Sequence, residues 1–338
     1  MDRTHERPVL ALRRLVNGYQ ISQAIHVAAS LGIPDQLRAE SLSADELAER
    51  VGADPDALYR LLRALASVDV MHEEPDRMFR LTALGDCLRS DTPEPVADWA
   101  VFIGQPYHWQ AWGDLLHGVR TGENAFRHVH GTDTWTFRSQ HPELSAAFDR
   151  AMAANSKQIT SSFLSTYDFS RFELIVDVGG GNGSLLAAIL QRHPHPRGIV
   201  FDQPHVVALA ERVLESAGVA DRCRTEGGNF FESVPAGGSA YLMKAILHDW
   251  EDADARSILR TCRNAMDRGA TLLVIERELG DSNEEADAKF SDLNMLVNPG
   301  GRERSKADYQ GLLEDTGFKY TGFKPTGSAY GVFEGIAT

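Results

Sequence analysis

A glycine-rich turn at residues 177–183 is the first feature of this sequence that could do chemistry. The apolar run LIVDV leads into Gly179-Gly180-Gly181-Asn182-Gly183, where Gly179, Gly181 and Gly183 stand at every second position. Glycine lets the chain turn sharply and lets a ligand touch the backbone, because no Cβ is in the way. A dinucleotide fold would have GxGxxG, but Ser184 stands where the last glycine belongs. The spacing therefore favours a cofactor that lacks a pyrophosphate.

An acidic residue ends the next apolar run. Asp202 closes RGIVFD, and a carboxylate at the end of such a strand can accept hydrogen bonds from both hydroxyls of a ribose. The alternative is that Asp202 caps the helix that follows. We favour the ribose role, because a glycine-rich turn with an acidic strand end is more specific than either feature alone.

The elements that must position these residues form an alternating pattern from Phe172 onward. Short β-rich runs such as SAYLMKAIL and ATLLVIERE alternate with helical runs such as ARSILRTCRNAM. This predicts a parallel sheet with helices on both faces, which binds ligands at the carboxyl ends of its strands. Two last runs around Thr326 have no helix between them and predict an antiparallel hairpin. The predicted fold class is α/β, with a Rossmann-like domain at 169–338 after a mostly helical domain at 1–168.

The N-terminal domain has the pattern of a winged helix. Ser43 and Glu46 form a capping box, Asp54-Pro55 begins a second helix, and residues 68–82 read as a hairpin. Residues 1–90 carry 11 Lys/Arg against 14 Asp/Glu, the wrong sign for a DNA-binding surface. We therefore expect packing or dimerisation, with an apolar stripe that predicts a homodimer: Ile21, Ile25, Ala28 and Leu31.

Composition narrows the class of protein further. The 338 residues carry a net charge of −14, which disfavours nucleic acid as a partner. We find no apolar run of about 18 residues and no signal sequence, so we expect no membrane partner and a cytoplasmic location. The three cysteines show no CxxC spacing, and the scattered histidines predict no metal site.

Five motifs in order resemble the small-molecule O-methyltransferases of the caffeic-acid type, which include bacterial enzymes acting on polyketides and phenazines. The motifs are DVGGGNG at 177–183, FDQPHV at 201–206, GGNFFESVP at 227–235, MKAILHDWEDADA at 243–255 and NPGGRERS at 298–305. The resemblance covers nearly the whole chain. It implies a class I methyltransferase fold, dimerisation through the N-terminal domain, S-adenosylmethionine (SAM) as cofactor with S-adenosylhomocysteine as product, and a small aromatic hydroxyl substrate.

The resemblance also assigns roles to individual residues. The general base matches His248 and its supporting acids match Glu276 and Glu303; by position alone, His248 could equally be a helix-capping histidine. The cofactor residues that it implies are Gly179 and Gly181 at the methionine part, Asp202 at the ribose, Asn229, Phe230 and Trp250 at the adenine, and Lys244 beside the cofactor. The family often has Asp in place of Asn229, whose amide oxygen can still accept a hydrogen bond. The acceptor-pocket positions are Phe148, Met152, Met295 and Asn298, although Met and Phe at this spacing could simply fill a core.

Three other readings stay open at this point. A relative of the family could keep SAM but hydroxylate, decarboxylate or cyclise its substrate, since such proteins share the glycine turn. A SAM-sensing DNA regulator is disfavoured by the acidic winged helix, and an NAD dehydrogenase by the glycine spacing. Intact His248 and Glu303 favour methyl transfer.

Overall fold

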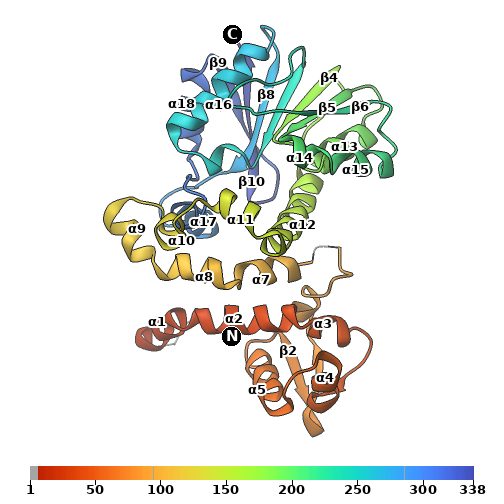
Figure 1. The fold of residues 1–338 in the computed structure, drawn as a ribbon, viewed down its shortest axis with the longest axis vertical. Coiled ribbons are helices and arrows are strands. Elements are labelled where there is room, and N and C mark those ends of the chain that lie inside the picture. The colour runs from red at the N-terminus through yellow and green to blue at the C-terminus, as the bar shows by residue number, and fades with distance from the viewer. Residues whose placement is uncertain (1–6, 94, 285) are drawn as a thin grey trace. The chain divides into compact units, whose positions relative to one another are not determined.

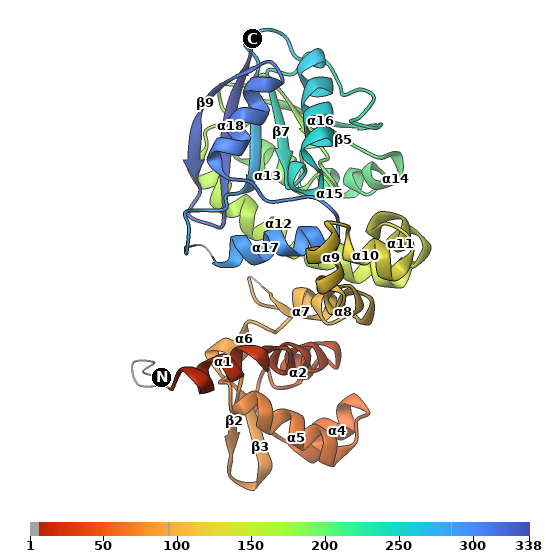
Figure 2. The same ribbon diagram turned by 90° about the vertical axis from the view of Figure 1, so that its left-hand side faces the viewer.

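The structure, a computed structural model, describes residues 7–93, 95–284 and 286–338. The chain divides into two compact units, one of Met1–Gln110 with Arg138–Asn155 and one of Ala111–Phe137 with Ser156–Thr338. Figures 1 and 2 show the elements of each unit. Each unit is thus built from two separate stretches of the chain, whereas the sequence pattern predicts a single boundary after residue 168. That boundary stays a prediction.

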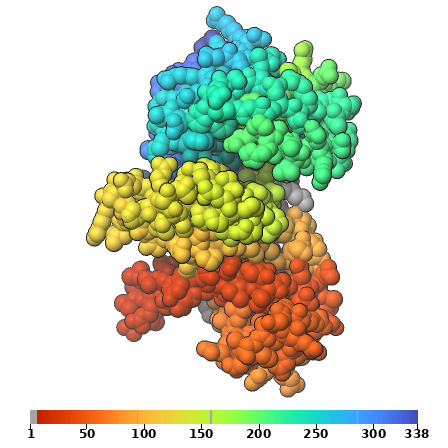
Figure 3. All heavy atoms as spheres, viewed as in Figure 1, coloured from red at the N-terminus to blue at the C-terminus, as the bar shows by residue number. Residues whose placement is uncertain are grey.

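The first unit contains the predicted helix, helix and hairpin. Ser43 and Glu46 form the capping box of α4 (Ala44–Val51), and the Asp54 carboxylate accepts an N–H at the start of α5 (Pro55–Ala66). The hairpin of β2 and β3 takes β1 as a third antiparallel strand. In the space-filling view the orange residues of this region form one rounded body (Figure 3), whose buried core includes Leu47, Leu62 and Phe79. The other elements here are β1 (Leu42–Ser43), β2 (Met71–Glu74), β3 (Met78–Leu81), α1 (Pro8–Val16), α2 (Gly18–Ser30), α3 (Ile33–Gln36), η1 (Pro75–Arg77) and α6 (Ala83–Asp86).

Exposed apolar surface in this unit lies chiefly on α1. Leu12, Leu15 and Val16 are 63%, 77% and 67% exposed. The stripe expected on α2 is only partly available, because Ala28 is fully buried and Ile25 packs against the same core. The more exposed apolar surface that a second chain could cover is therefore on α1, although Tyr19 and Val27 of α2 are also exposed.

The segment from residue 97 to residue 166 is helical, as its pattern predicts. Its helices are α7 (Ala97–Ile103), α8 (Pro106–Gly113), α9 (Leu115–Thr121), α10 (Ala125–His130), α11 (Thr134–Gln140) and α12 (Pro142–Thr166). Within the second unit, the Asn124 side chain between α9 and α10 donates to the carbonyls of Leu296 and Asn298. This contact holds the α9–α10 segment against the end of α17 (Ala286–Val297).

A seven-stranded sheet dominates the second unit and confirms the predicted fold class. Its order is β6-β5-β4-β7-β8-β10-β9. The first five strands are parallel, and β10 runs antiparallel to both β8 and β9, so the predicted terminal hairpin closes the sheet. The strands are β4 (Leu174–Val178), β5 (Arg197–Asp202), β6 (Cys223–Gly227), β7 (Ala240–Lys244), β8 (Thr271–Arg277), β9 (Phe318–Pro325) and β10 (Tyr330–Ala337).

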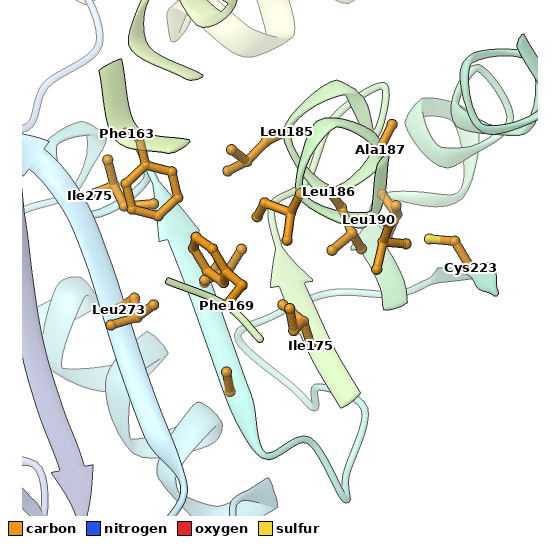
Figure 4. Close-up of a cluster of buried hydrophobic side chains, with 14 of the residues drawn as sticks. Phe163, Phe169, Ile175, Leu185, Leu186, Ala187, Leu190, Cys223, Leu273 and Ile275 are labelled. Atoms are coloured by element: carbon orange, nitrogen blue, oxygen red, sulfur yellow. The ribbon is translucent and has the colours of Figure 1, made fainter. Parts of the chain in front are cut away.

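Helices cover both faces of this sheet. On one face, Phe163 of α12 lies beside Ile275 of β8, and Leu186 of α13 belongs to the same buried cluster as Ile175 of β4 (Figure 4). On the other, Ile258 of α16 and Leu312 of α18 pack over the opposite side chains of the strands. Each such buried side chain contributes about 1.5–3 kcal/mol. The helices are α13 (Ser184–Arg192), α14 (Pro204–Val207), α15 (Ala210–Ser216), η2 (Leu247–Asp249), α16 (Asp252–Ala265) and α18 (Lys306–Asp315).

Two further observations bear on the expectations from composition. In the ranges that the structure describes, no helix is both long and apolar enough to cross a bilayer. The three cysteines are free thiols; Cys87 is exposed, whereas Cys223 and Cys262 are buried. Burial raises the pKa of the Cys223 thiol to about 12.

Candidate active site

The glycine turn lies between β4 and α13, at the carboxyl ends of the parallel strands. The N–H of Gly179 donates to the carbonyl of Phe201 over 2.8 Å, which ties the turn to β5. A Cβ on Gly179, whose φ is 71°, would lie 2.3 Å from the Cδ1 of Ile246. A Cβ on Gly181, whose φ is 59°, would meet nothing within 4 Å. The turn is therefore closely packed at Gly179 and open at Gly181, where a ligand has room to approach.

Asp202 stands at the end of β5 and faces this turn. Its carboxylate accepts the N–H of Gly181 over 2.9 Å and that of Gln203 over 2.7 Å. The N-cap of α14 is Gln203, so Asp202 does not cap that helix. Its carboxylate still has lone pairs for ligand hydroxyls beside the open side of the turn.

Of the three residues predicted to contact the adenine, Phe230 and Trp250 lie next to each other, whereas Asn229 makes hydrogen bonds to other residues. The rings of Phe230 and Trp250 meet edge to face, with centroids 6.0 Å apart. The exposed Asn229 accepts the N–H of Phe231 through its side-chain oxygen and donates to Glu232. The lone pair that an adenine amino group would use is thus partly occupied.

Asp177, a buried residue of β4 that interacts electrostatically with the predicted cofactor neighbour Lys244, had no role in the sequence analysis. Asp177 is 2% exposed, and among the described residues its Oδ2 has no hydrogen-bond partner. Burial, partly offset by Lys244, raises the pKa of Asp177 to about 7. The pKa of Lys244 is lowered by burial, and its Nζ donates to the Oγ of Ser156 over 2.8 Å. Asp177 is the first residue of the glycine motif, and that position could have identified it as part of the site. No sequence pattern identifies Ser156 as the partner of Lys244.

His248 lies in η2, just after β7, next to two buried glutamates. Its Nδ1 is 3.4 Å from Glu303 Oε1 and 3.6 Å from Glu276 Oε2, and its Nε2 is 3.5 Å from Asp249 Oδ1. The imidazole is only 13% exposed. Burial alone would lower the pKa of His248, but the three carboxylates raise it well above its usual value. The structure thus brings together the three residues that the resemblance named.

Glu276 fixes the backbone that carries His248. Its Oε1 accepts the N–H groups of Ile246, Leu247 and His248 over 2.9, 2.7 and 3.4 Å. The turn into this segment needs Ala245 at a φ of 54°, an uncommon conformation for a residue with a Cβ. Burial, offset in part by His248, raises the pKa of Glu276 to about 7.

Glu303 reaches the imidazole from the NPGGRERS loop. Ser291 donates to its Oε1 over 2.7 Å, and Arg277 Nε lies 3.8 Å from the same oxygen. Burial would raise the pKa of Glu303, but the contacts with His248, Ser291 and Arg277 outweigh it and lower the pKa. Glu303 therefore stays ionised beside the imidazole.

The loop of Glu303 lies directly against the backbone of the His248 segment. A Cβ on Gly301 would be 2.0 Å from the carbonyl oxygen of His248, so this approach requires glycine. Arg304, 1% exposed, donates to the carbonyls of Leu247 and Trp250. Sequence reasoning missed Arg304, which ties the two loops together.

The four predicted acceptor-pocket residues fall in different units. Met295 and Asn298 are 7% and 4% exposed in and just after α17, in the second unit. Phe148 and Met152 belong to α12 in the first unit, where the guanidinium of Arg138 lies 3.5 Å from the Phe148 ring centre. Their shared role in a pocket stays a prediction.

Comparison with known proteins places this geometry in a family. Residues 112–319 match the O-methyltransferase domain and residues 13–91 the O-methyltransferase dimerisation domain. The phenazine O-methyltransferase PhzM of Lysobacter antibioticus is 40% identical over 96% of this chain and 94% of its own. The O-demethylpuromycin-O-methyltransferase of Streptomyces alboniger is 44% identical over 91% and 83%. The crystal structure of LaPhzM has a TM-score of 0.93 at 39% identity, covering 98% of this chain and 100% of that one.

Two more distant relatives bear on the chemistry. NcsB1 from neocarzinostatin biosynthesis was solved with SAM and 2-hydroxy-5-methyl naphthoic acid; it is 33% identical, with a TM-score of 0.82 over 94% of this chain and 96% of its own. Aclacinomycin 10-hydroxylase RdmB of Streptomyces purpurascens is 34% identical over 90% and 83%.

The sheet order, the glycine turn and the terminal hairpin define a class I SAM-dependent methyltransferase. The matches over nearly the whole chain narrow the assignment. This chain belongs to the O-methyltransferase family with a dimerisation domain and is a SAM-dependent O-methyltransferase. These matches confirm the resemblance that the five motifs indicate.

Proposed function

We propose that this enzyme transfers a methyl group to the hydroxyl of a small aromatic molecule, with His248 as general base. The observation that carries the proposal is the placement of His248 against Glu303 and Glu276, 3.4 and 3.6 Å away. The segment of His248 also packs against the glycine turn through Ile246. A proton acceptor and the proposed cofactor site are thus adjacent.

The chemistry explains why these groups are needed. Bound SAM supplies an electrophilic methyl group on a sulfonium sulfur, and an in-line displacement requires an aligned oxygen that loses its proton. With Nδ1 directed at the glutamates, His248 takes the hydroxyl proton at Nε2. The ionised Glu303 fixes the tautomer and stabilises the imidazolium, as in other carboxylate–histidine pairs.

The residues at the glycine turn fit this cofactor. Gly181 faces open space, the Asp202 carboxylate has spare lone pairs, and the buried Asp177 Oδ2 lacks a described partner. We assign the methionine part to Gly179 and Gly181, the ribose to Asp202, the adenine to Phe230 and Trp250 with a weaker contact from Asn229, and a place beside the cofactor to Lys244.

The acceptor class comes from the relatives and from the predicted pocket residues. The names of the relatives include a phenazine O-methyltransferase, and NcsB1 was solved with a naphthoic acid. Apolar side chains with one amide suit a flat aromatic ring that carries a polar edge. We assign Met295 and Asn298 of the second unit to this pocket, and the roles of Phe148 and Met152 in the first unit stay predictions from the resemblance.

The test is incubation of the enzyme with methyl-labelled SAM and a panel of aromatic hydroxyl compounds, read by mass spectrometry. The expected result is a product that carries the labelled methyl on oxygen. RdmB is named a hydroxylase, so a product that gains an oxygen or loses a carboxyl, without the label, would contradict the proposal.

The dimerisation domain and the exposed face of α1 also support a homodimer. Leu12 and Leu15 are more than half exposed on α1, a large apolar area for a lone chain to leave in water. We expect a dimer in sedimentation at micromolar concentration and a monomer for the double variant Leu12→Asp, Leu15→Asp. A monomeric wild-type protein would contradict this part of the proposal.

A further inference from the structure

Two histidines and two carboxylates meet where α9 and α10 face each other, outside the proposed active site. His117 of α9 and His128 of α10 stack ring on ring, with centroids 3.7 Å apart and planes 9° from parallel. Asp114 precedes α9, and Glu123 lies in the loop between the helices. We call these four residues the α9–α10 cluster.

Each imidazole in the cluster donates to its own carboxylate. His128 Nδ1 lies 2.7 Å from Asp114 Oδ2, and His117 Nε2 lies 2.9 Å from Glu123 Oε2. Asp114 occupies the N-cap position of α9 but makes no capping hydrogen bond, since its carboxylate turns toward His128 instead. A neutral imidazole that donates through one nitrogen presents a lone pair on the other. At His117 this is the arrangement in which a carboxylate outside the coordination shell, here that of Glu123, orients a metal-binding histidine.

We propose that the α9–α10 cluster binds a divalent transition-metal ion such as Zn²⁺. Ligand atoms of Asp114, His117 and His128 all lie within 4.8 Å of one another. Imidazole with carboxylate is a donor set that suits Zn²⁺. Metal binding exchanges the Asp114–His128 hydrogen bond for shared coordination: the ring of His128, which is 51% exposed, turns out of the stack so that its nitrogen and a carboxylate oxygen of Asp114 face the same ion as His117. Water completes the coordination on the open side.

The proposed site joins two helices that support the end of α17. Asn124, in the loop between His117 and His128, donates to the carbonyls of Leu296 and Asn298. An ion held by both helices fixes this loop and, through Asn124, the backbone of Asn298. The ion is thus structural, and methyl transfer by His248 does not require it.

Metal titration of the tag-free protein tests the proposal. After treatment with a chelator and dialysis, we expect one Zn²⁺ per chain by calorimetry, and Co²⁺ bound at the same site to give visible absorption bands. His117→Gln and His128→Gln should each weaken Zn²⁺ binding at least tenfold. His195→Gln, which changes an exposed histidine in the loop after α13, should bind as wild type does.

Two results would overturn the proposal. One is that the wild type binds no Zn²⁺, or that both histidine variants bind Zn²⁺ as tightly as the wild type does. The other is binding that survives in those variants and disappears in His248→Ala, because His248, Glu276 and Glu303 also lie within ligating distance of one another. S-adenosylhomocysteine affinity equal to wild type shows that a variant is folded; if one histidine variant fails this check, the other and Asp114→Asn carry the test.

Discussion

The second unit holds two histidine–carboxylate clusters that differ in their surroundings. In the active-site cluster, Glu276 is fully buried and His248 is 13% exposed. In the α9–α10 cluster, the side chains of His128 and Glu123 are 51% and 70% exposed. The same residue types thus lie in a water-poor interior in one place and at the surface in the other.

On the proposed mechanism, burial rather than residue type is what suits one of these histidine–carboxylate clusters to proton transfer. In the candidate active site, burial itself raises the pKa of Glu276, the neighbouring carboxylates raise the pKa of His248 against its burial, and contacts with His248 and Ser291 lower the pKa of Glu303 against its burial. At the surface, water screens the same charges. Pairs of variants, one in each cluster, can therefore distinguish effects on catalysis from effects on local structure.

The largest expected effect is on turnover. His248→Ala should reduce kcat about a hundredfold or more, with S-adenosylhomocysteine affinity nearly unchanged, because general-base losses are of that order. His117→Gln, measured without added metal, should keep wild-type turnover. A His248→Ala enzyme with full turnover on an un-ionised phenol would mean that transfer works by positioning alone.

Cofactor affinity should change with a substitution at the proposed cofactor site and not with one in the α9–α10 cluster. Asp202→Ala removes a carboxylate that we assign to the ribose, so calorimetry should show S-adenosylhomocysteine binding weaker by about 10- to 100-fold, the range for hydrogen bonds to a charged group. Asp114→Ala should leave this affinity unchanged. Equal affinity of Asp202→Ala and wild type would remove the ribose assignment.

Glycine substitution distinguishes close packing from backbone preference. At Gly301 a Cβ would lie 2.0 Å from the His248 carbonyl, whereas at Gly122, with a φ of 76°, it would meet nothing within 4 Å. Gly301→Ala should lower the free energy of unfolding by about 1–3 kcal/mol through overpacking and lower kcat as well. Gly122→Ala should cost about 1 kcal/mol for its left-handed backbone and leave kcat intact. Equal thermal midpoints and kcat in the two variants would contradict the close approach.

The smallest effect is a shift in the pH profile. Because the pKa of His248 is raised, its imidazole stays protonated to higher pH, so kcat should rise with pH through an inflection above that of free imidazole. Glu303→Gln removes one negative charge, which should move the inflection to lower pH and reduce the plateau about tenfold. His117→Gln should keep the wild-type inflection. A wild-type inflection at about 6.5 would show that the carboxylates do not act on His248.

Local signals predicted much of this molecule. The capping box at Ser43, the alternation of strands and helices, and the hairpin around Thr326 each depend on residues close in sequence, and the structure has all three. The glycine motif and Asp202, the last residue of β5, could be recognised from the sequence because both lie at strand ends of one sheet.

Contacts between distant segments could not be read in the same way. Arg304 holds the carbonyl of Leu247 across 57 positions, and Ser291 reaches Glu303 from a neighbouring helix. The sequence does not predict that His117 and His128 stack, because the turn between α9 and α10 that brings them together has no distinctive pattern. The apolar stripe on α2 was misjudged for a related reason: its Ala28 is covered by a core that only the folded unit assembles.

The distribution of thiols makes the unmodified protein addressable by labelling at one position. Cys87 is exposed after α6, whereas Cys223 and Cys262 are buried and burial raises the pKa of both thiols. Since the thiolate is the reactive form, a maleimide fluorophore or a nitroxide attaches at Cys87 alone under mild conditions. In a pair of associated chains, two such probes would report the distance between the copies by spectroscopy without any engineered cysteine.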